Sequence, residues 1–457
     1  MLDISLNDFL KLRDVRFINI PDEKFNARHL KGISIDSRTI ESGQIYWAIK
    51  GERFDGHDFV SESHSKSALC SVISEKRFPD FSNLEIPLIV VPDTLLALQQ
   101  LAHVQRKKFK IPVIALTGSN GKTTTKEMIA KILQTRQNVH KTKGNQNNQI
   151  GCPLTMLLLT EIHDAAVLEL GTNQFGEIEI LSKMVEPSHA LITLIGDTHL
   201  ELLESREGVA KEKFQLFDNL PAGSTIYKNL DDPFIAGYNR SSLKYVTYSF
   251  EHEADVKGAY GPIDKNGCGS LKVNDDFEIK LKVPGIHNVR NALAAVSVGL
   301  NMGFSGKEIK KALESYIGFA QRMQIIKWNE VTIVNDAYNA NPASMELAID
   351  TVLKIKRTGN VILALGDMNE LGKQSAKMHK DLLEYALSCG AHKIYILGDK
   401  MNTACAKLKK SQSKNITQCD NLNDLASKLV EGVSGGDILL LKGSRSMQME
   451  KVMGYLP

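Results

Sequence analysis

Short apolar runs separated by polar segments recur along the chain, and they predict the strands of α/β sheets. In residues 1–110 these runs are bounded by Gly, Asp, Ser and Pro clusters, and they cover residues 44–49, 68–73 and 88–91. The spacing predicts a small α/β domain over residues 1–110.

The pattern changes at residue 111. Residues 111–116 (IPVIAL) form a continuous apolar run, which is typical of a strand covered on both faces. A glycine loop and a helix predicted over about 122–133 follow it, and further apolar strands are predicted at 165–170 and 190–195. This βαβ alternation predicts a central P-loop-type ATPase domain with a mostly parallel sheet over residues 111–319.

Residues 276–283 (DFEIKLKV) alternate between polar and apolar, which predicts an antiparallel strand at a sheet edge, before an alanine-rich helix from about Asn288. After Phe319 a third alternation predicts a C-terminal Rossmann-like α/β domain over residues 320–457. Its predicted strands are 331–334, 361–365, 393–397 and 438–441. Each ends in a polar loop, and ligands of doubly wound sheets collect at such carboxyl ends, so these loops are expected to carry function.

Composition narrows the class of protein. The 457 residues suggest about three domains, and 42% hydrophobic with 24% charged residues is typical of a globular protein. The formal net charge of +3 gives no electrostatic reason to expect a nucleic-acid partner. The first 14 residues do not resemble a signal peptide, no apolar run approaches the roughly 18 residues of a membrane span, and the six cysteines form no C-x-x-C pair. A cytoplasmic protein with reduced thiols is expected.

A loop suited to phosphate binding follows the first strand of the central domain. It consists of Thr117, Gly118, Ser119, Asn120, Gly121, Lys122, Thr123 and Thr124. Glycines let backbone N–H groups face phosphate oxygens, Lys122 can reach the β/γ-phosphates, and Thr123 can hold Mg²⁺. The loop is shorter than G-x-x-x-x-G-K-[ST], so a glycine turn with a coincidental lysine is the alternative. The strand–loop–helix context favours nucleotide binding.

Polar residues also stand near two neighbouring strand ends. Residues 143–151 hold three Asn and two Gln, which suits either a ligand-binding loop or a solvated one. Glu169 ends a predicted strand near the phosphate loop. A carboxylate there either holds Mg²⁺ or lies in the N-cap region of the following helix. His199 is similarly placed after strand 190–195, and a structural histidine is the alternative there.

Nine segments, in order over nearly the whole chain, together resemble the Mur ligases. They are DSR (36–38), TGSNGKTTTKEM (117–128), GNQNNQIGCPLT (144–155), LELGTNQFGEIE (168–179), DTHLE (197–201), GIHNVRNALAA (285–295), NDAYNANP (335–342), LGDMNELG (365–372) and KGSRSMQME (442–450). Within the family, NxNNxIGxPLT, NDAYNANP and KGSRxxxME are similar to the branch that adds D-alanyl-D-alanine.

The resemblance implies an ATP-dependent carbon–nitrogen ligase. ATP would phosphorylate the peptide carboxylate of UDP-N-acetylmuramoyl-tripeptide (UDP-MurNAc-tripeptide), and the amine of D-Ala-D-Ala would displace phosphate. Lys122, Glu169 and His199 are then expected to be catalytic. The family pattern implies two Mg²⁺ ions, one held by Thr123 and Glu169 and a second by His199. A monomer is expected.

The resemblance implies further ATP contacts from Asn288, Asn291, Arg322, Asp336 and Tyr338. The two asparagines, one helical turn apart, would meet adenine; Arg322 would contact phosphate. Asp336 and Tyr338 would meet the ribose and adenine from the third domain. The family usually has Gly before this arginine, whereas Gln321 stands here, so the local backbone is expected to differ.

The acceptor substrates are expected to contact other segments. Ser37 and Arg38 resemble the uridine-diphosphate motif of the first domain, and Asn147 and Asn148 would meet the muramoyl-peptide.

Lys442, Ser444 and Arg445 end the last strand with two positive charges suited to the dipeptide carboxylate. Lys213 lies about where some Mur ligases carry a carbamylated lysine, although an ordinary surface lysine is favoured and Lys211 leaves the register open.

Two alternatives remain at this point. One is a related amide ligase, either a Mur ligase that adds a single amino acid or a folylpolyglutamate-synthetase-like enzyme. The other is a nucleotide-dependent switch without ligase chemistry. A first domain that binds uridine diphosphate argues against the folate enzyme, and a third domain with polar loops at four strand ends argues against the switch.

Overall fold

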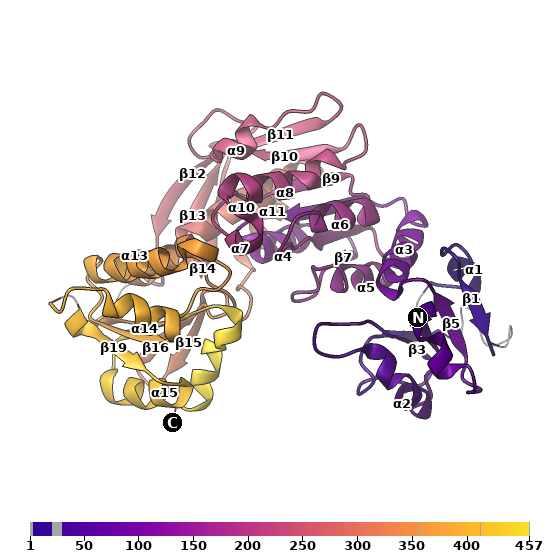
Figure 1. The fold of residues 1–457 in the computed structure, drawn as a ribbon. Helices are drawn as coiled ribbons and strands as arrows, with labels where there is room; N and C mark the ends of the chain where they lie inside the picture. Colours follow the sequence, from indigo (N-terminus) through magenta and orange to yellow (C-terminus); the bar gives the residue numbers. More distant parts are fainter. Residues whose placement is uncertain (1–2, 21–29, 356, 412, 457) are drawn as a thin grey trace.

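The computed structural model describes residues 3–20, 30–355, 357–411 and 413–456, which form three domains, each built on its own sheet (Figure 1). In Figure 1 the N-terminal domain (indigo) and the C-terminal domain (orange to yellow) lie at opposite ends of the central domain. The predicted three-domain α/β fold is confirmed. Within the described residues, no helix is both long and apolar enough to span a membrane.

The N-terminal domain has a five-stranded sheet in the order β1-β5-β4-β3-β2. Its strands are β1 (Arg16–Ile18), β2 (Gly32–Ser34), β3 (Gln44–Trp47), β4 (Cys70–Ser74) and β5 (Leu88–Val91). Its helices are α1 (Leu6–Phe9), α2 (Val60–Ser65) and α3 (Thr94–Lys107). All neighbouring strands are parallel except β1 and β5.

The central domain has a nine-stranded sheet in the order β14-β13-β12-β11-β10-β9-β6-β8-β7. Its strands are β6 (Val113–Thr117), β7 (Val139–Lys141), β8 (Ala165–Glu169), β9 (His189–Ile192), β10 (Thr225–Asn229), β11 (Lys244–Ser249), β12 (Val256–Ile263), β13 (Cys268–Val273) and β14 (Phe277–Pro284). Its helices are α4 (Lys122–Leu133), α5 (Gly151–Leu157), α6 (Glu177–Val185), α7 (Leu200–Leu203), α8 (Arg206–Asp218), α9 (Pro233–Gly237), α10 (Ile286–Asn301) and α11 (Gly306–Glu314). The predicted antiparallel edge strand is β14, which pairs with β13.

The C-terminal domain has a six-stranded sheet in the order β15-β16-β20-β17-β18-β19, parallel except for β15. Its strands are β15 (Gln324–Trp328), β16 (Val331–Asn335), β17 (Val361–Gly366), β18 (Lys393–Leu397), β19 (Ile416–Cys419) and β20 (Ile438–Lys442). Its helices are α12 (Pro342–Lys354), α13 (Ser375–Ser388), α14 (Asp399–Ala406) and α15 (Leu422–Gly432). Short 3₁₀ turns follow at η4 (Gly372–Gln374) and η6 (Arg445–Met447).

The two outer domains are attached differently. One hydrophobic core runs from the N-terminal sheet through Leu98 and Leu101 of α3 to Met156 and Leu181 of the central domain. The C-terminal sheet has separate cores on its two faces. The N-terminal domain is therefore joined to the central domain by continuous apolar packing, whereas hydrogen bonds such as those between Asn120 and Asn341 link the C-terminal domain to it.

Parallel pairing brings several strand ends to one edge of each sheet. In the central sheet, Leu116 of β6 lies opposite Glu169 of β8, and Thr117 lies opposite Ile192 of β9. In the C-terminal sheet, Leu365 of β17 lies opposite Lys442 of β20. The loops after these strands meet where the two domains face each other, and the candidate site is built there.

Candidate active site

The phosphate loop joins β6 to α4, and two of its glycines adopt conformations that side chains rarely take. Gly118 has φ 148°, and a Cβ there would lie 1.9 Å from Thr193 Oγ1. Gly121 has φ 82°, and a Cβ there would lie 2.2 Å from Asn291 Oδ1. The Thr193 hydroxyl also donates to Asn120 O over 2.5 Å, which holds the loop in place. Both positions therefore require glycine.

Lys122 begins α4, and its side chain folds back over the loop. Its Nζ donates to Gly118 O over 2.7 Å. Burial lowers the pKa of Lys122, nearby Glu169 raises it, and Arg322 lowers it further, so the net shift is downward. A phosphate oxygen bound in this loop would give the ammonium an anionic partner in place of a carbonyl.

Glu169 ends β8 and is almost fully buried. Its Oε1 accepts a hydrogen bond from Asn147 Nδ2 over 2.8 Å. Its Oε2 accepts none from any described residue, and Lys126 Nζ lies 4.0 Å away. A buried carboxylate oxygen without a donor is costly, and Mg²⁺ prefers such oxygen ligands. This oxygen therefore fits a metal ligand.

Two cavities meet at the phosphate loop. The first has a volume of about 280 Å³ and the second about 680 Å³. Both are lined by Asn120, Gly121, Lys122, Arg322 and Ser344. Thr123 lines the first cavity, whereas Glu169 and His199 line the second. Lys122 thus stands at the junction of the two cavities.

The predicted adenine residues lie together on the wall of the first cavity. Asn291 Nδ2 donates to Asn288 Oδ1 over 3.1 Å, and Asn288 Nδ2 donates to Pro284 O over 2.7 Å. Both side chains come from the first turns of α10 and are buried. Asp336 lines the same cavity from the C-terminal domain.

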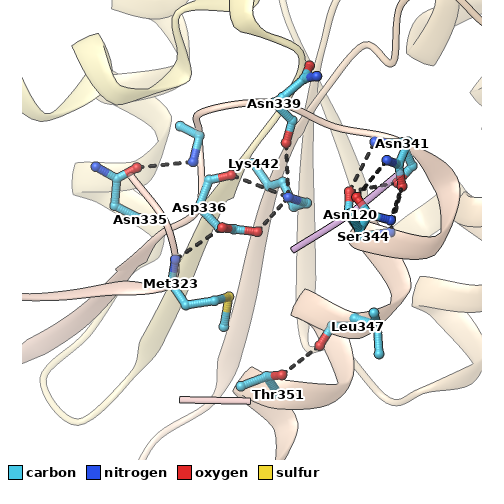
Figure 2. Close-up of polar contacts among 11 residues, drawn as sticks. Asn120, Met323, Asn335, Asp336, Asn339, Asn341, Ser344, Leu347, Thr351 and Lys442 are labelled. Carbon is cyan, nitrogen blue, oxygen red and sulfur yellow. Dashed lines mark hydrogen bonds and ion pairs between the residues drawn. The ribbon is translucent and has the colours of Figure 1, made fainter. Parts of the chain in front are cut away.

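The Asp336 carboxylate is held by a network that Figure 2 shows. Its Oδ1 accepts from Met323 N over 3.0 Å, and its Oδ2 accepts from Lys442 Nζ over 2.5 Å. Lys442 Nζ also donates to Asn339 O over 3.0 Å. Lys442, which was expected to receive the dipeptide carboxylate, has its ammonium buried against Asp336 and lines the first cavity.

Arg322 and Tyr338 stack at the cavity junction. The guanidinium carbon of Arg322 lies 4.0 Å from the ring centroid of Tyr338, and that of Arg445 lies 5.9 Å from it. Tyr338 lines the second cavity rather than the first, so the structure separates it from the predicted adenine residues. Gln321, which stands where the family has Gly, has φ 60°, a left-handed conformation that favours glycine.

His199 precedes α7 with φ 54°, and it lies on the second cavity. Its Nδ1 lies 2.6 Å from Oε2 of Glu370, which comes from the C-terminal domain. The pKa of Glu370 is below its usual range, chiefly because of this contact with His199. A histidine at a cavity wall with a carboxylate partner can serve as a metal ligand.

Lys213 of α8 is buried, with 1% of its surface exposed, so the favoured prediction of a surface lysine is wrong. Lys211 is the exposed one, and its Nζ lies 5.9 Å from the ring centroid of Phe175. Burial lowers the pKa of Lys213 well below its usual range, Lys122 lowers it further, and Glu212 raises it. Of the two lysines that the sequence left open, Lys213 is the buried one and Lys211 the exposed one.

The other two predicted dipeptide residues line the second cavity. Ser444 is buried, and its hydroxyl oxygen accepts from Asn369 N over 2.8 Å. Arg445 is exposed and donates to Glu450 Oε1 over 2.7 Å and to Gln321 Oε1 over 3.0 Å. Of the cations predicted for the dipeptide, Arg445 is the one that faces this cavity.

The predicted acceptor residues divide between two places. Asn147 and Asn148 line the second cavity, and Asn148 Oδ1 also accepts from Gly151 N over 2.8 Å at the start of α5. Ser37 and Arg38 lie in the N-terminal domain and line neither cavity. The guanidinium of Arg38 makes two hydrogen bonds to Asp36 and its backbone N–H makes a third, and together they lower the pKa of Asp36 to about 2.

Two features escaped the prediction from sequence. Asn120 and Asn341 exchange two amide hydrogen bonds of 3.2 and 2.8 Å, which join the phosphate loop to the start of α12. Glu370 contacts His199 across the same domain boundary. Both contacting residues lie within family-like segments, NDAYNANP and LGDMNELG, but nothing in the sequence signals their partners.

Three family models match the chain. They are "Mur ligase family, catalytic domain" over residues 29–106, "Mur ligase middle domain" over 116–299, and "Mur ligase, glutamate ligase domain" over 321–445.

Full-length relatives match as well. The chain is 34% identical to UDP-N-acetylmuramoyl-tripeptide–D-alanyl-D-alanine ligase of Bacillus subtilis, over 95% of this chain and 94% of that protein. It is 32% identical to the Escherichia coli ligase of the same name, over 93% and 94%. The structure of MurF from Acinetobacter baumannii superposes with a TM-score of 0.89 at 30% identity, covering 100% of this chain and 99% of that one. MurF from Thermotoga maritima in complex with ADP gives 0.82 at 26% identity, covering 94% and 98%.

Proposed function

The chain belongs to the Mur ligase family, and we propose that it joins D-alanyl-D-alanine to UDP-MurNAc-tripeptide. The reaction consumes ATP, passes through an acyl phosphate, and yields UDP-MurNAc-pentapeptide, ADP and phosphate. Relatives that bear this activity in their names match more than nine-tenths of the chain at 31–34% identity. The product is a precursor of peptidoglycan.

The single observation that supports this reaction most directly is the junction of the two cavities. The smaller cavity suits a nucleotide, and the larger one suits the peptide end of the acceptor together with the dipeptide. Lys122 and Arg322 line both, so a phosphoryl group that leaves ATP in one cavity would meet the acceptor carboxylate in the other without leaving their reach.

The residues at the junction supply what such a reaction needs. A carboxylate is a poor electrophile, because its charge is spread over two oxygens, and phosphorylation converts one oxygen into a leaving group. Lys122 and Arg322 would stabilise the charge on the transferring phosphoryl group. The dipeptide amine then attacks the acyl carbon, the C–N bond forms, and the C–O bond to phosphate breaks. Arg445 on the second cavity would hold the dipeptide carboxylate, beside Ser444.

The donor set at the junction fits Mg²⁺. Oε2 of Glu169 is buried without a donor among the described residues, and Thr123 offers a hydroxyl at the start of α4. Thr123 and Glu169 would hold one ion, and His199 a second. Bound Mg²⁺ would neutralise phosphate charge and so make the phosphoryl group easier to transfer.

The surroundings of Lys213 suit a carbamylated side chain better than a charged ammonium. Lys213 is buried, and the positive charge of Lys122 further disfavours a charge on Lys213. A neutral amine adds readily to CO₂, and the resulting carbamate is an anion that would attract Lys122 and a metal ion. We therefore propose that Lys213 is carbamylated in the active enzyme. If so, a Lys213→Ala enzyme should regain activity with a short added carboxylic acid, and no recovery would argue against the carbamate.

The remaining acceptor contacts are assigned by family resemblance. Asn147 and Asn148 on the second cavity would meet the muramoyl-peptide, and Ser37 and Arg38 of the N-terminal domain would meet the uridine diphosphate. Asn288, Asn291 and Asp336 on the first cavity would meet adenosine.

The test is phosphate release measured with ATP, UDP-MurNAc-tripeptide and D-Ala-D-Ala, omitting each in turn. We expect release to require all three. Lys122→Ala should reduce the rate by about 100-fold or more, because it removes a positive charge from the transferring phosphoryl group. Lys131→Ala, an exposed lysine on the same helix, is the matched control.

Omitting each substrate in turn also distinguishes the proposed reaction from the alternative functions. A Mur ligase that adds a single amino acid would accept that amino acid in place of the dipeptide, and a nucleotide switch would release phosphate without either. Release that ignores D-Ala-D-Ala would contradict the proposed reaction.

A further inference from the structure

Three contacts lie close together where residues 197–201 of the central domain meet the C-terminal domain. Nδ1 of His199 lies 2.6 Å from Oε2 of Glu370, and Glu201 N donates to Glu370 O over 3.2 Å. Gly372 approaches so closely that a Cβ there would lie 3.2 Å from Glu201 Cα. The loop after β17 is therefore fitted to this segment by backbone and side chain together.

Both residues of the pair adopt left-handed backbone conformations. His199 has φ 54° and Glu370 has φ 63°. Histidine enters this region more readily than most residues, but glutamate has no such preference. Strained residues of this kind persist where the surroundings hold them, and they cluster at functional sites.

Glu370 sits on a loop that is firmly attached to its own domain. The preceding Asn369 is held by Ser444 Oγ, which accepts from its N–H over 2.8 Å, and by Lys400 Nζ, which donates to its Oδ1 over 2.6 Å. Met368 N donates to His379 Nε2 over 2.9 Å. The carboxylate of Glu370 consequently moves with the C-terminal domain and not with the central one.

A metal-ligating histidine usually donates its other ring N–H to a carboxylate, which sets the tautomer and the orientation of the ring. Glu370 stands where such a partner of His199 is needed: its Oε2 lies 2.6 Å from Nδ1, although the angles there are not those of a hydrogen bond. Asp197, two residues before His199, instead accepts from Arg206 Nε over 3.0 Å. No other described carboxylate forms an ion pair with His199.

We propose that Glu370 is a positioning residue that accepts the Nδ1–H of His199 and so leaves Nε2 free for Mg²⁺. This inference rests on the proposed metal role of His199. Because the carboxylate belongs to the C-terminal domain, the second metal site is complete only when that domain is docked on the central one. Metal affinity at His199 thereby depends on the position of a domain that contributes no metal ligand itself.

The test is Mn²⁺ binding, with Mn²⁺ as the probe for Mg²⁺, followed by electron paramagnetic resonance in the presence of a non-hydrolysable ATP analogue. The wild-type chain should bind two ions, and His199→Ala should lose one of them. Glu370→Ala should weaken that same ion by about 10- to 100-fold and leave the other unchanged, which also reports that the chain is folded. Glu370→Gln should weaken it less, because an amide oxygen still accepts a hydrogen bond.

Glu204→Gln is the matched control, since it removes an exposed carboxylate close to the same segment and should leave both ions unchanged. Unaltered Mn²⁺ binding by Glu370→Ala, alongside loss of an ion in His199→Ala, would overturn the role of Glu370. Unaltered Mn²⁺ binding by His199→Ala would show that His199 is not a metal ligand, and the inference would then fail as well. Dipeptide-dependent phosphate release by the wild-type chain would show in either case that the ligase function stands.

Discussion

Lys442 offers the sharpest contrast between the sequence-based and the structure-based expectation. A strand-end lysine that receives the dipeptide carboxylate would, when replaced, affect mainly dipeptide binding. In the structure its ammonium is instead buried against Asp336, where it also donates to two backbone carbonyls (Figure 2). Lys442→Met keeps much of the aliphatic stem but leaves the Asp336 carboxylate buried without its counter-ion. Breaking a buried pair in this way costs about 3–5 kcal/mol.

This loss should be visible in the strands that carry the pair. Hydrogen exchange measured by mass spectrometry reports the opening of β16 and β20 separately from the rest of the chain. If closing is fast, 3–5 kcal/mol corresponds to exchange faster by about 150- to 5,000-fold in these strands. Lys451→Met, which removes an exposed lysine of the same domain, should leave their exchange unchanged.

A second substitution tests the pairing itself. Asp336→Asn removes the charge that Lys442 neutralises, so the double variant should be less destabilised than the sum of the two single variants. Kinetically, Lys442→Met should raise the KM for ATP more than that for D-Ala-D-Ala, because Asp336 lines the first cavity. A variant with a raised dipeptide KM, unchanged ATP KM and unchanged exchange in β16 would refute the structural interpretation.

Three further outcomes follow from the geometry. Gly121→Ala should weaken ADP binding at least about tenfold in calorimetry, because its φ is 82° and a Cβ would lie 2.2 Å from a side-chain amide oxygen; Gly223→Ala, with φ 81° but nothing within 4 Å, should leave ADP binding unchanged. Arg445→Ala should raise the KM for D-Ala-D-Ala far more than that for ATP in the phosphate-release assay, and an unchanged dipeptide KM would exclude Arg445 as the carboxylate partner. Burial lowers the pKa of His140 and His287 to about 4, so the unfolded chain binds more protons below pH 6.5. The central domain should therefore lose stability as the pH falls from 6.5 to 4, by up to about 3 kcal/mol for each histidine, and its urea midpoint should fall with it. A midpoint that stays constant over this pH range would contradict the burial argument.

The strands that could be predicted are those whose own residues form a sufficiently long apolar run. Strand β18 matches the predicted 393–397, and α4 matches the predicted 122–133. Strands β2 (GIS) and β7 (VHK) were missed, because three residues carry no periodicity. The order of strands in each sheet could not be predicted from the sequence either, since pairing depends on contacts between distant segments.

In the candidate site, too, features carried by neighbouring residues could be predicted and contacts between distant residues could not. The phosphate loop could be predicted because its glycines, lysine and threonine act within eight neighbouring residues. Lys442 and Asp336 are separated by 106 residues, and nothing local indicates that this lysine is buried against that carboxylate. Lys213 and Lys211 are two residues apart on α8, so only packing against the rest of the domain decides which one faces inward.

The buried cations explain how a nearly neutral chain can recognise highly charged substrates. A net charge of +3 over 457 residues leaves little long-range attraction for polyanions. Lys122 and Lys442 instead line the cavities, Lys213 is buried in α8, and burial lowers the pKa of each. A charge in such low-dielectric surroundings interacts strongly with a group that reaches it and weakly with one that does not. Shape therefore decides which anions gain from these charges, so the site can favour a nucleotide triphosphate and a peptide carboxylate over nucleic acid.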